Sequence, residues 1–283
     1  MQEKKSQEKI LYVTDLDGTL LNSSERINEK SLAIINELVE QGMLFTYATA
    51  RSIFSSSVVA KGLSANIPVI VHNGVMIIHP ATGEMLHFCG FTEEEQQNAV
   101  DFFTRQQIYP LVYSMIDGRQ RVSYLTDGQN EGMRHYVQSR KDDKRLRPVS
   151  RAEHLFEGDI FYFTCIGERE ELLPLQEFFA KDENYTCTFQ QEIYRPEYWF
   201  EIMPKKATKA QAIARLKEMW GCKKIVSFGD AINDLPMFRM SDECYAVDNA
   251  VAELKAVATG VIGSNNEDSV ALWLKEHAVI NKE

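Results

Sequence analysis

Apolar and polar residues follow one repeating pattern near the N-terminus of the chain. Short apolar segments that suit buried strands alternate with segments of about 10 to 15 residues whose apolar positions recur with a helical period. The pattern predicts strands at residues 10–14, 43–49 and 68–71, and helices at residues 28–42 and 52–63. Such alternation is typical of an α/β domain, in which helices cover both faces of a parallel sheet.

The pattern changes in the middle of the chain, where tight turns separate neighbouring apolar segments. The turns at residues 82–83 and 117–118 each lie between two strand-like segments, which predicts hairpins in place of helical crossovers. Helices also interrupt these strands, so the middle is expected to be an α+β domain. The first pattern returns toward the C-terminus. We therefore expect an α/β core at residues 1–81 and 197–283, interrupted by an inserted domain at residues 82–196.

The composition is that of an ordinary globular protein, and the charge limits the class of partner. The 283 residues are 44% hydrophobic and 25% charged, which leaves room for two domains with buried cores. A net charge of −10 disfavours nucleic acid or an anionic membrane surface as a partner. An anionic substrate would therefore need local positive charge or a metal ion.

Three features of the sequence predict a cytoplasmic protein. No apolar segment approaches the roughly 18 residues that span a membrane, and the charged first residues do not resemble a signal peptide. The five cysteines are scattered and include no C-x-x-C pair, which favours reduced thiols over disulfides or a zinc site.

Two acidic motifs stand at the predicted ends of strands. One is D-L-D-G-T-L, which starts at Asp15, and the other is G-D-A-I-N-D, which starts at Gly229. Ligands of open α/β sheets bind beyond the carboxyl ends of the strands, so both motifs are expected to meet in one crevice. Carboxylates that lie this close repel one another unless a cation with oxygen ligands neutralises them. The sequence therefore predicts a Mg²⁺ site.

These motifs make the chain resemble the haloacid dehalogenase superfamily, and specifically its Cof-type sugar-phosphate phosphatases. The resemblance covers nearly the whole chain. The matching segments are residues 15–20, 48–51, 201–209 and 229–234, with weaker support from Asn73-Gly74 and Asn249-Ala250. The resemblance implies a Rossmann-like parallel-sheet core and a large inserted cap domain.

The resemblance also implies roles for individual residues. Asp15 would be the nucleophile and Asp17 the general acid/base, and both would bind Mg²⁺ together with Asp230, Asp17 through its backbone carbonyl. Asp234 would orient Lys209. The candidate residues for phosphate or substrate binding are Leu16, Thr49, Ala50, Arg51, Asn73, Gly74, Lys209 and Asn233.

Several of these residues also have simpler interpretations. Thr49 either binds phosphate or satisfies a backbone group at the end of a strand. Arg51 either contacts the substrate or pairs with an acidic neighbour. Lys209 either binds phosphate or is an ordinary solvated helix residue.

The resulting prediction is a Mg²⁺-dependent phosphatase that hydrolyses phosphate monoesters of small metabolites through an aspartyl-phosphate. Sugar phosphates are the leading substrate class by resemblance, and phosphorylated cofactors such as pyridoxal phosphate or flavin mononucleotide stay open. Two alternatives are a phosphomutase and a non-catalytic protein that senses a metabolite. The intact pair Asp15 and Asp17 argues against the second alternative. The sequence does not predict the oligomeric state.

Overall fold

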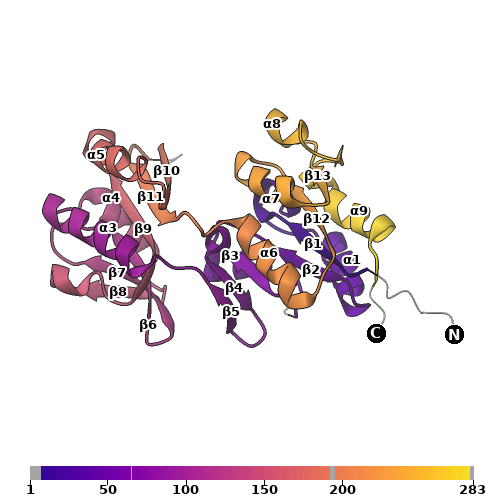
Figure 1. Ribbon diagram of the computed structural model, residues 1–283, viewed down its shortest axis with the longest axis horizontal. Helices are drawn as coiled ribbons and strands as arrows, with labels where there is room; N and C mark the ends of the chain where they lie inside the picture. The colour runs from indigo at the N-terminus through magenta and orange to yellow at the C-terminus, as the bar shows by residue number, and fades with distance from the viewer. Residues whose placement is uncertain (1–7, 65, 192–194, 281–283) are drawn as a thin grey trace. The chain divides into compact units, whose positions relative to one another are not determined.

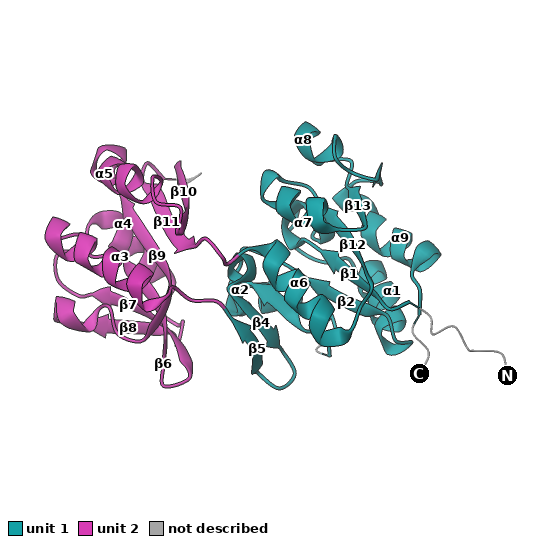
Figure 2. Cartoon of the chain, in the orientation of Figure 1, with its two compact units in different colours: residues 1–88, 208–283 teal, residues 89–207 magenta. Residues whose placement is uncertain are grey.

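The computed structural model describes residues 8–64, 66–191 and 195–280, so the charged residues 1–7 lie outside the described part. The chain forms two compact units, shown in Figure 2. Unit 1 contains residues 1–88 and 208–283, and unit 2 contains residues 89–207. The functional division into a catalytic core and a cap, with boundaries at residues 82 and 196, stays a prediction.

Unit 1 contains a parallel sheet. From edge to edge, its strands are β14 (Gly260–Val261), β13 (Glu243–Ala246), β12 (Lys224–Gly229), β1 (Ile10–Thr14) and β2 (Leu44–Tyr47). The central strand β1 is in register with both neighbours, so the carboxyl ends of β12, β1 and β2 lie at the same edge of the sheet.

Helices cover both faces of this sheet, as Figure 1 shows. The helices of unit 1 are α1 (Glu29–Glu40), α2 (Ile53–Val59), α6 (Lys209–Trp220), α7 (Leu235–Met240), α8 (Ala252–Lys255) and α9 (Ser269–His277). Helix α1 packs against α9, and α6 packs against α7. The ring of Trp273 on α9 contacts the rings of Tyr12 and Phe228 in the sheet. The predicted α/β fold class is confirmed.

A small antiparallel sheet extends unit 1 beyond β2. It contains β3 (Val69–Val71), β4 (Met76–His79) and β5 (Glu84–Phe88), and β4 and β5 form the predicted hairpin. A parallel bridge between Ala48 and Ile70 joins β3 to the end of β2. The segment after β3 is thereby held beside the segment after β2.

Unit 2 is built on a mixed sheet whose strands are antiparallel except for the pair β7 and β8. In spatial order the strands are β10 (Tyr185–Gln191), β11 (Tyr198–Pro204), β9 (Asp159–Gly167), β6 (Leu111–Ile116), β7 (Arg119–Leu125) and β8 (Leu146–Val149). Its helices are α3 (Glu93–Gln106), α4 (Glu131–Ser139) and α5 (Arg169–Phe179). Buried aromatic rings of α3, α5 and the sheet, among them Phe103, Phe163 and Phe179, form its core.

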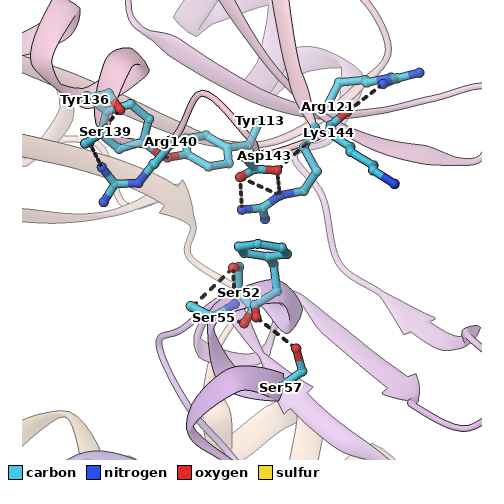
Figure 3. A network of polar contacts seen from close by, with 12 residues as sticks. Ser52, Ser55, Ser57, Tyr113, Arg121, Tyr136, Ser139, Arg140, Asp143 and Lys144 are labelled. Atoms are coloured by element: carbon cyan, nitrogen blue, oxygen red, sulfur yellow. Dashed lines mark hydrogen bonds and ion pairs between the residues drawn. The ribbon is translucent and has the colours of Figure 1, made fainter.

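Hydrogen bonds and an ion pair join polar side chains inside each unit, and Figure 3 shows two such groups from close by. In unit 2, the hydroxyl groups of Tyr113 and Tyr136 lie 2.7 Å apart, and Arg145 donates to both carboxylate oxygens of Asp143. In unit 1, the Ser52 hydroxyl accepts a hydrogen bond from the Ser55 amide and caps α2. In these pairs each polar group has a hydrogen-bond partner that replaces the water it loses when the protein folds.

Helix α2 ends at Val59, four residues before the predicted end of this helix. The hydroxyl groups of Ser56 and Ser57 donate to backbone carbonyls of the same helix, and serine side chains compete in this way with helical hydrogen bonding. Within the described part of the chain, no helix combines the length and the apolar character needed to cross a membrane.

Candidate active site

The two acidic motifs meet at the carboxyl edge of the parallel sheet of unit 1. Asp15 follows β1, and Asp230 follows the neighbouring strand β12. The Asp15 amide donates to the carbonyl of Phe228 at 3.0 Å, and the Thr19 hydroxyl donates to Asp230 Oδ1 at 2.9 Å. Residues that are more than two hundred positions apart in the sequence therefore share one site.

Gly18 makes this close approach possible. The residue has φ of 74°, and a Cβ atom at this position would lie 2.3 Å from Asp230 Oδ2. Any other side chain would displace the carboxylate, so the glycine of the first motif is required by the aspartate of the second.

Lys209 lies at the start of α6 and is 3% exposed. Its ammonium group donates to Asp15 Oδ1 at 2.6 Å and to Asp234 Oδ1 at 2.8 Å. The other oxygen of Asp234 accepts from the amides of Asp230 and Ala231 at 3.1 and 3.2 Å. The buried Asp234 thus fixes Lys209 beside Asp15, and Lys209 is not a solvated helix residue.

Burial and neighbouring charges shift the pKa values of these groups. Burial raises the pKa of Asp15 to about 7; Lys209 opposes this shift, whereas Asp234 and Asp230 add to it. Burial also raises the pKa of Asp230 to about 6, against the hydrogen bond from Thr19. Burial lowers the pKa of Lys209, but Asp15 and Asp234 outweigh this effect, so the lysine stays charged. One ammonium group therefore faces three carboxyl groups.

The carboxyl groups fit a divalent metal ion. One oxygen each from Asp15, Asp230 and Asp234 lie within 4.8 Å of one another. Within the described residues, Oδ2 of Asp15 and Oδ2 of Asp230 have no hydrogen-bond partner, which leaves each available as a ligand. Oxygen ligands with excess negative charge suit Mg²⁺. The contribution predicted for Asp17, through its backbone carbonyl, stays a prediction.

The side chain of Asp17 contacts Arg51. Arg51 Nε donates to both carboxylate oxygens at 3.0 and 2.9 Å, and Nη2 donates to Oδ1 at 2.6 Å. Arg51 Nη2 also donates to Glu25 Oε2 at 2.8 Å. The pKa of Arg51 is raised chiefly by the hydrogen bond to Asp17, so this guanidinium keeps its charge. The structure therefore contains the ion pair between Arg51 and an acidic neighbour that the simpler interpretation predicted.

Thr49 and Asn73 connect the segments around the site. The Thr49 hydroxyl accepts a hydrogen bond from the Arg51 amide at 3.1 Å, and the Thr49 carbonyl accepts one from the Asn73 amide at 2.9 Å. A Cβ atom on Gly74 would lie 2.2 Å from the carbonyl oxygen of Thr208, the residue before Lys209. In this structure the three residues hold the ends of β2, β3 and α6 together.

The remaining predicted residues have less distinctive surroundings. Leu16 is fully buried, whereas Ala50 and Asn233 are exposed, and Asn233 makes no side-chain hydrogen bond within the described residues. Asn249 donates to the carbonyl of Gly18 at 2.8 Å and so supports the turn of the first motif. Glu25 was not predicted, because no sequence motif indicates that its loop reaches Arg51.

Comparisons with known proteins agree with this geometry. A family model described as haloacid dehalogenase-like hydrolase matches residues 12–274. The 5-amino-6-(5-phospho-D-ribitylamino)uracil phosphatase YwtE of Bacillus subtilis is 26% identical over 280 residues, which cover 93% of this chain and 96% of the relative. YitU of the same organism, a phosphatase of the same name, is 24% identical over 273 residues, which cover 94% of this chain and 97% of the relative.

The crystal structure of TM0651 from Thermotoga maritima superimposes with a TM-score of 0.76 at 25% sequence identity, and the match covers 95% of this chain and 97% of that one. The predicted resemblance and the prediction of a hydrolytic enzyme are confirmed by these comparisons. Because the family model spans most of the sequence and the two acidic motifs meet in one place, the chain belongs to the haloacid dehalogenase-like hydrolases.

Proposed function

We propose that this protein is a Mg²⁺-dependent phosphatase that hydrolyses phosphate monoesters of small metabolites through an aspartyl-phosphate. The observation that carries the proposal is the placement of Asp15. Its carboxylate lies at the end of β1, 2.6 Å from the Lys209 ammonium group and beside Asp230. A carboxylate held next to fixed positive charge, at the edge where α/β sheets bind ligands, is suited to attack an anionic phosphoryl group.

The first step forms a bond between Asp15 and phosphorus and breaks the ester bond to the leaving alkoxide. Asp17 gives its proton to this oxygen, and the alcohol departs. In the second step a water molecule attacks the aspartyl-phosphate, Asp17 accepts a proton from it, and the bond between Asp15 and phosphorus breaks. Inorganic phosphate leaves, and both aspartates return to their initial states.

Charge around the phosphoryl group is stabilised by fixed donors. Lys209 is locked by Asp15 and Asp234, so it needs no reorganisation when negative charge shifts during the reaction. Mg²⁺, held by Asp15, Asp230 and the backbone carbonyl of Asp17, would supply Lewis-acid stabilisation of the phosphoryl oxygens. Thr49, at the carboxyl end of β2, is proposed to contribute its hydroxyl group to the same oxygens.

The proposed substrates are small polyhydroxylated phosphate esters. Two relatives are named as phosphatases of a phosphoribitylamino-uracil, in which the ester joins phosphate to a sugar alcohol chain. Sugar phosphates share this arrangement of an ester next to hydroxyl groups. We therefore propose a phosphorylated sugar or sugar alcohol as the substrate class.

The test is a phosphate-release screen over phosphorylated metabolites, which include hexose phosphates, flavin mononucleotide, pyridoxal phosphate and the phosphoribitylamino-uracil. We expect release with Mg²⁺ and none with excess EDTA. Isomerised sugar phosphate without free phosphate would indicate a phosphomutase instead. Saturable binding without turnover across the whole panel would indicate a sensing protein, and either result would contradict the proposal.

A further inference from the structure

Glu25 reaches the active site from the loop that joins β1 to α1. Its carboxylate accepts a hydrogen bond from Arg51 Nη2 at 2.8 Å, and the same nitrogen donates to Asp17 Oδ1 at 2.6 Å. Two carboxylates, from different parts of the chain, therefore share one nitrogen of one guanidinium. Within the described residues, Nη1 of Arg51 has no hydrogen-bond partner, so its two N–H donors are free for a ligand.

The backbone of this loop is arranged to present Glu25. The residue has φ of 53°, in the left-handed region that residues other than glycine and asparagine rarely adopt. Asn22 holds the loop in this conformation: its carbonyl accepts from the Glu25 amide at 2.9 Å, and its side chain accepts from the amides of Ser24 and Arg26. Unfavourable backbone conformations of this kind concentrate at functional sites.

The Glu25–Arg51 pair is poorly suited to a role in stability. The Glu25 side chain is 69% exposed, and ion pairs in contact with water contribute little to folding. The pair does have a clear geometric effect. The contacts of Nε and Nη2 with Asp17 set the plane of the guanidinium relative to that carboxylate, and the second carboxylate on Nη2 ties the guanidinium to the loop after β1.

We propose that Glu25 is a positioning residue of this enzyme: it holds the Arg51 guanidinium against Asp17 so that Nη1 of Arg51 binds an oxygen of the substrate. The proposal rests on the proposed phosphatase function. Arg51 then has two roles on separate edges of its guanidinium, one toward the carboxylates and one toward the substrate. The loop after β1 thereby contributes to substrate affinity without touching the substrate.

The test compares three single variants with the wild-type protein on one phosphate ester that the release screen identifies. Glu25→Gln keeps the shape of the side chain and removes its charge, and Glu25→Gly removes the side chain and relieves the left-handed backbone. Glu29→Gln is the matched control, since Glu29 is an exposed glutamate four residues later in the chain. Steady-state kcat and KM are measured together with the thermal unfolding midpoint.

We expect both Glu25 variants to raise KM by about three- to tenfold and to change kcat by less than about twofold, because an interaction used in substrate binding is weakened. Their unfolding midpoints should match or exceed that of the wild type, and Glu29→Gln should match the wild type throughout. In an Arg51→Ala background, Glu25→Gln should add no further increase in KM.

Three results would overturn the role of Glu25. These are an unchanged KM in Glu25→Gln, a fall in the unfolding midpoint that accounts for the loss, and an independent effect of Glu25→Gln in the Arg51→Ala background. A wild-type protein that releases phosphate from no ester would instead overturn the proposed function, and the role of Glu25 with it. An active wild type with an insensitive Glu25 would overturn only the positioning role.

Discussion

At the scale of single residues, carboxyl groups of the same type behave differently according to what each one contacts. Burial also acts on Asp143 in unit 2, yet the pKa of Asp143 is lowered, because hydrogen bonds from the side chain and backbone of Arg145 outweigh it. Lys209 beside Asp15 and Thr19 beside Asp230 offset the effect of burial only in part, and the pKa values of the two aspartates rise to about 7 and about 6. Neighbouring carboxylates thus add to the effect of burial at the proposed metal site, and a cation bound there would neutralise this negative charge.

The nucleophile assignment predicts the behaviour of Asp15→Asn. The amide cannot attack phosphorus, so kcat should fall by at least about a thousandfold, as for other variants that remove a nucleophile. Circular dichroism should match that of the wild type, because asparagine has the same shape as aspartate. Phosphate release within about tenfold of the wild type from the folded variant would refute the assignment.

The pH dependence of stability can be predicted for Glu201 on β11. Burial raises its pKa, and hydrogen bonds from Thr188 and Tyr162 offset this only in part. The folded protein therefore binds the proton of Glu201 more tightly than the unfolded chain does. The contribution of Glu201 to the free energy of unfolding is therefore largest below the unfolded pKa of about 4.3. It falls as the pH rises through the raised pKa of the folded protein.

Glu201→Gln removes this pH-dependent penalty. We expect the variant to gain stability relative to the wild type as the pH is raised from about 4 to about 8, measured by urea unfolding. Glu177→Gln on α5 is the control, since it removes the same charge from the surface of the same unit. A difference between Glu201→Gln and wild type that does not grow with pH would be inconsistent with a raised pKa.

At the scale of elements, the turn after β3 aligns the parts of the site. His72, Asn73 and Gly74 have φ values of 50°, 54° and 103°, so consecutive residues adopt left-handed conformations. The amides of His72 and Asn73 donate to the carbonyls of Arg51 and Thr49. The turn therefore stores backbone strain while it joins the segment after β2 to the start of α6.

Gly74→Ala tests this alignment, with Gly83→Ala as a matched control. Both glycines have positive φ, but a Cβ on Gly83 would meet nothing within 4 Å. The control should lose about 1 kcal/mol from its backbone conformation. Gly74→Ala should lose at least about 2 kcal/mol more, because its methyl group collides with Thr208, and kcat should fall as Lys209 shifts. Equal losses of unfolding free energy in the two variants would show that the close approach is unimportant.

The sequence predicted many elements because their hydrophobic patterns are strong. The strand at Ile10–Thr14 has the predicted bounds, and antiparallel strands flank both predicted turns, at residues 82–83 and 117–118. Elements with weak patterns were missed. Strand β14 contains two residues, Gly260–Val261, and exists because it pairs with β13, which no local pattern reveals.

At the scale of the whole molecule, unit 1 contains two sheets and unit 2 contains one, and each unit buries its own apolar side chains. The carboxylates that fit a metal ion all belong to unit 1. A ligand that binds only the folded state stabilises the part of the protein that forms its site. Binding of Mg²⁺ is therefore expected to affect the unfolding of unit 1.

This effect can be measured by calorimetry with Mg²⁺ and with EDTA. At about 100 times its dissociation constant, Mg²⁺ should stabilise the wild type by about 2.7 kcal/mol. Asp230→Asn should abolish this stabilisation together with activation by Mg²⁺. Asp248→Asn, which alters an exposed aspartate after β13, is the control and should retain it. An unchanged response of Asp230→Asn to Mg²⁺ would place the metal elsewhere.

By itself the sequence determined the α/β class of the core, the hairpins of the middle region and the acidic motifs, because these depend on residues that are close in the chain. Only the tertiary structure placed Asp15 next to Lys209, Gly18 against Asp230 and Glu25 on Arg51. Side-chain contacts between distant segments depend on strand register and on the space between elements. Neither of these is recorded in the local order of amino acids.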